Sequence, residues 1–231
     1  MLHKTRGVVL SYIRYRESSV IAKVYTEAFG IQSYVVSGVR SSRSKTNKIA
    51  LFQPLTLLDM VVYHKSKSDT LHRLSEIRNL YPFRQLPFDM VKTSLALFIA
   101  ELLGKCLKEE EPNEPLFNFI EQAVVELDGL EEGLESYHLV LMRHLAGYLG
   151  FGIDSATEFL EGLKEHRYGV LPDEGQKKGV EFLLKGDYER LRALGKGVRT
   201  SLLSRMLFYY RTHLENFGEM KSLEVLKAVL R

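Results

Sequence analysis

The sequence GVVLSYIRYRESSVIAKVY occupies positions 7–25 and establishes the fold class of the N-terminal part of the chain. Apolar side chains recur there at every second position in two runs, which are Val8, Leu10 and Tyr12, and then Val20, Ala22 and Val24. Successive side chains of a strand point to opposite faces, so this alternation predicts two half-buried β-strands.

The same pattern, dense in β-branched and aromatic residues, continues to about residue 80. It predicts five strands with breaks between them, near 3–15, 19–27, 30–37, 51–63 and 69–78. Five short strands in so few residues favour a compact closed barrel of the OB type. An SH3-like barrel would give nearly the same pattern, and periodicity alone leaves both open.

A change of period marks a second domain. Pro82 and Pro87 end the strand-rich part, because proline cannot donate a hydrogen bond to a strand ladder. Beyond them, apolar residues recur with the 3.6-residue period of amphipathic helices. We expect eight helices, at 88–108, 114–128, 133–150, 155–163, 174–185, 187–194, 199–217 and 222–230. The chain is therefore expected to be an α+β protein, with an OB-fold nucleic-acid-binding domain over 1–80 and an all-α domain over 81–231.

Charge is segregated along the chain. Residues 1–80 hold 13 Lys/Arg against 5 Asp/Glu, a net charge of +8, whereas residues 81–162 hold 5 against 15, a net of −10. Residues 163–231 hold 14 against 9, a net of +5. A basic N-terminal module is typical of polyanion binding. The alternative is a charge bias that only keeps the domains soluble and attracts them to each other.

Composition and motifs favour a binding protein over an enzyme. The longest apolar run is far shorter than the ~18 residues of a membrane span, and the N-terminus has too short an apolar stretch for a signal peptide, so we expect a cytoplasmic protein. No Gly-rich phosphate loop is present, and the seven histidines lack metal-ligand spacing. The single Cys106 excludes an internal disulfide. We expect no catalytic residues, no metal or other cofactor, and no small-molecule substrate.

Basic residues alternate with tyrosines in the first 80 positions, which is the chemistry that single-stranded nucleic acids require. Cations neutralise phosphates, while aromatic faces stack on bases. The candidate DNA-binding residues share a positive charge and a place in or beside the predicted barrel loops and strands; they are Arg14, Arg16, Lys23, Arg40, Arg43, Lys45, Lys48, Lys65 and Lys67. For any single tyrosine, a place in the barrel core is the alternative, because tyrosine is a good strand former.

Several segments resemble the RecO family of DNA repair and recombination proteins. The segments are Arg16–Ile21, Tyr25–Gly30, Val35–Ser41, Leu51–Leu55, Leu145–Phe151, Arg211–Leu214 and Lys221–Leu223, and they occur in the order found in that family. The resemblance covers nearly the whole chain. It implies an OB barrel that binds single- and double-stranded DNA, strand annealing, and a role in DNA damage repair and recombination on nucleoid DNA.

The resemblance also implies protein partners for the helical domain. RecO-like proteins bind RecR and the acidic, Phe-terminated tail of the single-strand-binding protein, and help to load RecA. A cation beside an apolar pocket is needed to hold such a tail. The candidates are Arg143, Arg205, Arg211 and Lys221, with Leu145, Met206 and Tyr210 as pocket walls. For Arg205 and Arg211, the alternative is that each merely faces solvent on an amphipathic helix.

One segment departs from many RecO-like proteins, which carry a four-cysteine zinc site at this point of the chain. The matching stretch here, 152–175, contains no cysteine. We therefore expect a helical domain without zinc, in which this stretch is held by apolar side chains, namely Phe159, Leu160, Leu163, Tyr168 and Leu171.

Two other functions remain open at this stage. An RNA- or ribosome-associated OB-fold protein would use the same basic barrel. A metal-dependent nuclease could use Asp59 or Asp69, but the basic domain lacks a second acid cluster nearby.

Overall fold

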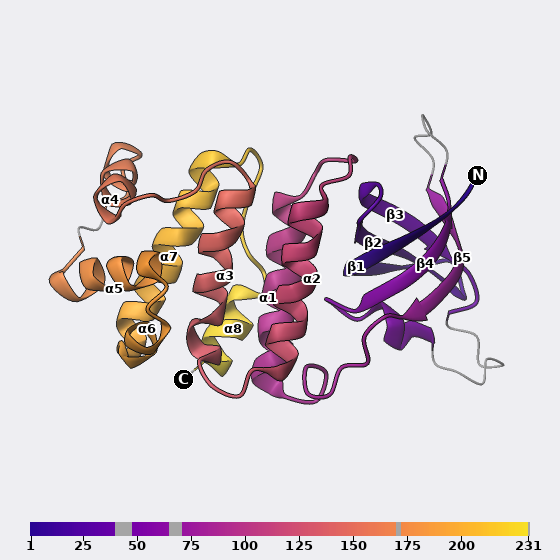
Figure 1. Cartoon of the computed structure of the whole chain (residues 1–231), viewed down its shortest axis with the longest axis horizontal. Coiled ribbons are helices and arrows are strands. Elements are labelled where there is room, and N and C mark those ends of the chain that lie inside the picture. The colour runs from indigo at the N-terminus through magenta and orange to yellow at the C-terminus, as the bar shows by residue number, and fades with distance from the viewer. Residues whose placement is uncertain (40–47, 65–70, 170–171, 231) are drawn as a thin grey trace. The chain divides into compact units, whose positions relative to one another are not determined.

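The computed structural model describes residues 1–39, 48–64, 71–169 and 172–230 (Figure 1). Contacts divide the chain into two compact units, Met1–Asp128 and Gly129–Arg231. The predicted Arg40, Arg43, Lys45, Lys65, Lys67 and Leu171 lie outside the described residues.

The first unit contains a closed five-stranded barrel. Its strands are β1 (Leu2–Tyr15), β2 (Ser19–Thr26), β3 (Gly30–Val36), β4 (Leu57–Tyr63) and β5 (His72–Asn79). Around the barrel they follow the order β1-β2-β3-β5-β4, and every neighbouring pair is antiparallel except β3 with β5. The prediction of an OB-type barrel followed by helices is confirmed. On β2 the alternating Val20, Ala22 and Val24 are fully buried in the barrel core. On β1 the core residue is Val9, whereas the predicted Val8 and Leu10 are buried outside that core.

The predicted strand over 51–63 is wrong in its first half. Lys48–Phe52 forms a short 3₁₀ helix, η1, and β4 begins only at Leu57. Pro54 cannot donate to a ladder, and Leu55 has a φ of 64°, which a strand does not allow. Phe52 is fully buried in the barrel core, so its apolar character reflects packing rather than strand structure.

The barrel closes through a short parallel contact between β3 and β5, which we call the parallel seam. It consists of two residue pairs, Tyr34 with His72 and Val35 with Arg73. By contrast, β2 and β3 pair over seven residues each, from Val20 with Val36 to Thr26 with Gly30. Among the described residues, the parallel seam is therefore the shortest ladder of the barrel.

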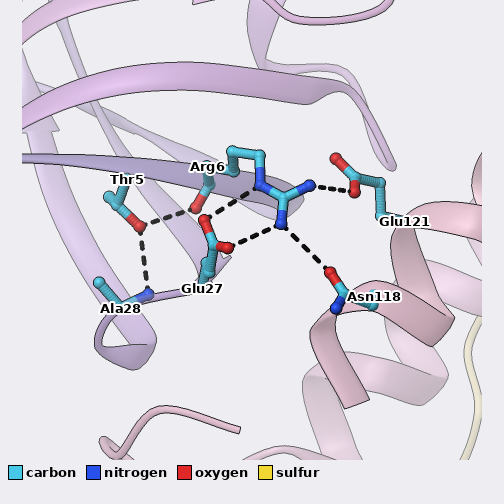
Figure 2. Close-up of polar contacts among 6 residues, drawn as sticks. All are labelled: Thr5, Arg6, Glu27, Ala28, Asn118 and Glu121. Carbon is cyan, nitrogen blue, oxygen red and sulfur yellow. Dashed lines mark hydrogen bonds and ion pairs between the residues drawn. The ribbon is translucent and has the colours of Figure 1, made fainter. Parts of the chain in front are cut away.

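Two helices, α1 (Met90–Cys106) and α2 (Glu114–Gly129), pack on the barrel and belong to the same unit. Arg6 on β1 joins them through the contacts of Figure 2: its guanidinium pairs with Glu27 and with Glu121, and it donates to the Asn118 Oδ1 at 3.1 Å. At the β2–β3 turn, the Ile31 amide donates to the carbonyl of Glu109 at 3.0 Å. These contacts fix the helices to one side of the barrel.

Asp128 near the end of α2 holds the linker between barrel and helices. Its carboxylate accepts hydrogen bonds from the backbone amides of Arg84, Gln85 and Leu86 at 2.7–3.2 Å. Burial opposes the charge, but these bonds and the nearby Lys92 outweigh it and lower the pKa of Asp128 below its ordinary value. The linker is thus anchored by a buried carboxylate.

The second unit is helical. Its helices are α3 (Leu134–Tyr148), α4 (Ala156–Glu165), α5 (Glu174–Lys185), α6 (Tyr188–Ala193), α7 (Lys196–His213) and α8 (Leu223–Val229). Counting α1 and α2, all eight predicted helices form, and the largest differences lie at the ends of α7. Side chains at the starts of α4, α5 and α6 cap the helices, because Ser155, Asp173 and Asp187 each accept a backbone amide. None of the helices among the described residues has the length and apolarity that crossing a membrane would require.

Candidate nucleic-acid interface

A groove of about 530 Å³ lies on the barrel beside the parallel seam. Its walls come from the β1–β2 turn, the end of β3, η1 and the start of β5. Three basic residues line it, Arg16, Lys48 and Arg73, and none of its described lining residues is acidic. In OB folds, nucleic acids bind between the β1–β2 and β4–β5 loops. The groove occupies the matching position, since Arg16 belongs to the first of these loops and Leu71 lies at the end of the second.

One edge of the groove combines an aromatic ring with a cation. The Arg16 guanidinium carbon lies 5.1 Å from the ring centroid of Tyr15, in a cation–π arrangement. Arg16 has a φ of 53°, a left-handed conformation that costs a non-glycine residue about 1–3 kcal/mol. Strained backbone of this kind clusters at binding sites, and here it positions a ring and a charge at the same edge.

The remaining wall is partly apolar. Val35, Leu74 and Ile77, partly buried on β3 and β5, belong to its lining, and Val36 and Phe52 reach it from the barrel core, where they are buried. A groove with an apolar wall, one aromatic edge and a basic rim suits unstacked bases whose phosphates lie outside.

The structure brings together only some of the predicted DNA contacts. Arg16 and Lys48 lie in the groove, whereas Arg14 is exposed on β1 and does not line it. Lys23 faces α1 instead, and its ammonium donates to the carbonyl of Gly104 at 3.0 Å. Burial there, with a smaller effect of Lys108, lowers the pKa of Lys23. Lys23 therefore has little freedom to contact phosphate.

Arg73 is a groove residue that the sequence patterns missed. It is exposed on β5 and reaches the groove because the parallel seam pairs it with Val35. The pairing of β3 with β5 joins residues far apart in the chain, and periodicity does not indicate it.

Two other cations of the barrel, Arg6 and Lys4, are in ion pairs. Arg6 is held by Glu27 and Glu121, and these partners raise its pKa above the ordinary value, with the hydrogen bond that Arg6 donates to Glu27 as the largest cause. Lys4 lies 3.5 Å from Asp59. Arg16, Lys48 and Arg73 have no ion-pair partner among the described residues, so the groove holds the positive charge that a polyanion could use.

In the second unit, most of the predicted partner residues are buried. Leu145, Met206 and Tyr210 are fully buried, and the Tyr210 hydroxyl donates to the carbonyl of Met142 at 2.7 Å. The alternative that Arg205 faces solvent is wrong, because it is 1% exposed. These side chains form the core around α7 and offer no surface to a partner.

Contacts inside this core stabilise the buried positive charge of Arg205. Its guanidinium donates to the Gln176 Oε1 at 2.8 Å and lies 4.9 Å from the ring centroid of Tyr168. Arg211 and Lys221 are exposed.

Arg143 lies in a shallower groove of about 330 Å³. Its lining also includes His144, Tyr148, Gly147 and Gly152. Arg143 donates to the carbonyl of Leu184 at 3.3 Å, and the ring of Tyr148 is 45% exposed. The guanidinium of Arg143, the exposed Tyr148 and the two glycines therefore line the same groove.

The stretch expected to replace a zinc site forms α4 and the turn after it. Phe159 and Leu163 are buried, and the ring of Tyr168 packs edge-on against Phe208 at 5.0 Å between centroids. In the part of the chain that the structure describes, no group of three His, Cys, Asp or Glu residues could hold a metal ion.

Comparison with known proteins covers both units. The family model described as "Recombination protein O N terminal" matches residues 1–83, and the one described as "Recombination protein O C terminal" matches residues 87–230. The chain is 36% identical over 242 residues to the DNA repair protein RecO of Flavobacterium psychrophilum, with 98% of each chain covered. It is 34% identical to the proteins of the same name from Flavobacterium johnsoniae and Phocaeicola vulgatus, again with 98% of each chain covered.

Proposed function

The chain belongs to the RecO family of DNA repair proteins, which are non-enzymatic recombination mediators, and on that premise we propose that it binds single- and double-stranded DNA and anneals complementary strands. With RecR and the single-strand-binding protein, it helps to load RecA during DNA recombination. It acts in the cytoplasm, on nucleoid DNA.

The groove beside the parallel seam is the single observation that supports DNA binding most. Arg16, Lys48 and Arg73 surround it, and Tyr15 supplies a ring at its edge. Phosphate neutralisation by such cations depends little on sequence, as does stacking on a ring. A repair protein that must act on any damaged DNA needs both properties.

Single and double strands use this surface differently. A single strand can place bases against Tyr15 and the apolar wall, because its bases are unstacked. A duplex keeps its bases stacked and presents its phosphates to the basic rim. The proposal therefore assigns base contacts to the single-stranded complex alone.

The groove at Arg143 is the proposed dock for the tail of the single-strand-binding protein. The guanidinium would pair with a carboxylate of the tail, and the terminal Phe ring would lie against Tyr148 and the backbone of Gly147 and Gly152. Asp154 at the rim disfavours a tail carboxylate there, so the acidic end is expected near Arg143. Arg211 and Lys221, both exposed, are secondary candidates for the acidic residues that precede the Phe.

Annealing of complementary oligonucleotides coated with the cognate single-strand-binding protein tests both halves of the proposal. The full chain should accelerate annealing with the intact coating protein and lose most of that effect when the coating protein lacks its C-terminal tail. Acceleration that is independent of the tail would refute the tail dock. No annealing by folded protein would refute the mediator function and favour the RNA-associated alternative, which competition between DNA and structured RNA would then test.

A further inference from the structure

Four aromatic rings pack together at the end of the barrel where the parallel seam begins, three of them stacked and one edge-on. We call them the ring ladder. The ring of His64 lies between those of Phe29 and His72, with centroid distances of 4.0 Å and 4.6 Å and interplanar angles of 14° and 26°. His3 packs edge-on against Phe29 at 5.4 Å and against His64 at 6.3 Å. The ladder thus joins β1, the β2–β3 turn, the residue after β4, and β5.

The ring ladder lies on the weakest closure of the barrel. His72 is one of the two residues by which β5 pairs with β3, and its ring also lies 6.1 Å from that of Tyr34. With only two residue pairs in the parallel seam, side-chain packing has to contribute much of its stability. β4 and β5 already pair there, Tyr63 with Arg73, so the link to β3 comes from Phe29, which precedes Gly30 and stacks on His64.

The surroundings of the His64 ring disfavour its protonated form. Its Nδ1 is buried without a hydrogen-bond partner among the described residues. The N-terminal ammonium donates to the carbonyl of His64 at 3.3 Å, and His3 and His72 are its ring neighbours. Burial first, then His72 and His3, lower the pKa of His64, and the carboxylate of Glu110 opposes them only in part.

We propose that the ring ladder is a proton-sensitive clasp on the parallel seam of the barrel. When the histidines are neutral, the rings stack and hold β5 against β3. Protonation of His64 would place a positive charge beside the N-terminal ammonium and would give its buried Nδ1 a proton without an acceptor among the described residues, which disfavours the closed arrangement. Because the open seam binds a proton more readily than the closed seam, opening is favoured as the pH falls below the ordinary histidine value of about 6.5.

Opening of the parallel seam would also change the DNA groove, because the seam and the groove share backbone of β3 and β5. Leu71 and Arg73 line the groove on either side of His72. Val35, the seam partner of Arg73, lines it as well. A seam that opens would move two walls of the groove together, so the clasp couples proton concentration to the shape of this surface.

Hydrogen exchange of the full chain without DNA tests the clasp independently of the proposed function. Amides of residues 34–36 and 72–74 are followed at pH 7.5 and 5.5, after correction for the pH dependence of chemical exchange. In the wild type, protection should fall by up to about tenfold at the lower pH, which lies one unit below the ordinary histidine value of the open state. His64→Phe keeps a ring but cannot be protonated, so its protection at these amides should be nearly the same at both pH values. His166→Phe, at an exposed histidine outside the ladder, should behave as the wild type.

Equal protection of the wild-type seam at both pH values would overturn the proposal, as would an undiminished fall in His64→Phe. If His64→Phe does not fold, His64→Gln, which is also neutral at both pH values, provides the same comparison. DNA binding by the groove is not needed for either result.

Discussion

Arg6 on β1 and Glu121 on α2 form an ion pair that joins the barrel to the helices of the first unit (Figure 2). The same guanidinium donates to both carboxylate oxygens of Glu27, at 3.0 and 2.7 Å, and lies 5.1 Å from the ring centroid of Phe117. One side chain therefore connects a strand, a turn and a helix.

Replacing Arg6 by Ala should lower the free energy of unfolding by about 1–2 kcal/mol, because two partly exposed carboxylates lose a shared cation. Urea unfolding monitored by circular dichroism measures the change. Lys4→Ala is the matched control, since the side chain of Lys4 is 75% exposed and its pairing with Asp59 should contribute about 0–1 kcal/mol. Equal effects of both substitutions would argue against the linking role of Arg6.

Removal of the groove cations should weaken DNA binding without regard to sequence. The triple variant Arg16→Ala, Lys48→Ala, Arg73→Ala is expected to reduce the salt slope of oligothymidine binding by about 0.7 for each phosphate that is no longer neutralised. Fluorescence anisotropy over a series of salt concentrations provides the slope. Arg78→Ala, on the same strand but outside the groove, should leave it nearly unchanged. If the triple variant keeps the wild-type slope, the DNA surface lies elsewhere.

Gly30→Ala should be strongly destabilising. Gly30 has a φ of 61°, and an added Cβ would lie 2.3 Å from the carbonyl oxygen of Glu109. We expect a decrease in stability of about 2–4 kcal/mol from backbone strain and from the clash with the α1–α2 loop. Gly38→Ala separates the two causes, since its φ is 71° but no atom lies within 4 Å of the added Cβ. Differential scanning calorimetry should show a smaller decrease for Gly38→Ala, which has the backbone strain without the clash. A similar decrease in both variants would mean that the clash is relieved.

Acid should destabilise the second unit through His138 on α3. Burial, and then the charge of Arg199, lower the pKa of this histidine to about 3. Between the ordinary histidine pKa near 6.5 and this lower pKa, His138 is protonated in the unfolded chain but neutral in the folded chain. The free energy of unfolding therefore decreases as the pH falls. Each pH unit in this window contributes about 1.4 kcal/mol. His138→Gln should flatten the decline in urea unfolding of the second unit between pH 6.5 and 5; an unchanged decline would assign it to other groups.

Arg143→Ala should weaken binding of an acidic peptide ending in Phe by about tenfold or more, the usual effect of removing a charge-assisted hydrogen bond. Isothermal titration calorimetry with the peptide measures the affinity. Arg190→Ala is a suitable control, because Arg190 is an exposed arginine of the same unit that already pairs with Asp187. A greater decrease in affinity for Arg211→Ala than for Arg143→Ala would move the dock to α7.

Periodicity predicted the elements whose two faces differ in environment. In β1 and β2 one face lies in the barrel, and in α4 and α5 one face lies in the core, so apolar spacing indicates the structure. Periodicity failed for residues 51–56, because a residue such as Phe52, which is buried from a 3₁₀ helix, gives the same apolar pattern as one buried from a strand.

The candidate site was harder to predict, since it depends on contacts between distant parts of the chain. Lys23 is basic and lies on a strand, but its neighbour is Gly104, 81 residues away. Arg205 occupies a helix position that a solvent-facing side chain could also occupy. Its burial depends on tertiary contacts, among them those with the ring of Tyr168 and the side-chain amide of Gln176. Charge along the sequence therefore locates the basic module but not the residues that face one groove.

The carboxylate of Asp128 has a consequence for the order in which the chain acquires its structure during synthesis. The backbone amides of residues 84–86 depend on an acceptor that the ribosome adds more than forty positions later. All five strands of the barrel have been translated by then, but the segment after them has no partner for these amides until α2 has emerged. Domains fold as units from the N-terminus, so the nascent barrel should spend the intervening elongation time with a loose C-terminal end. The first unit is complete only once Asp128 has left the exit tunnel.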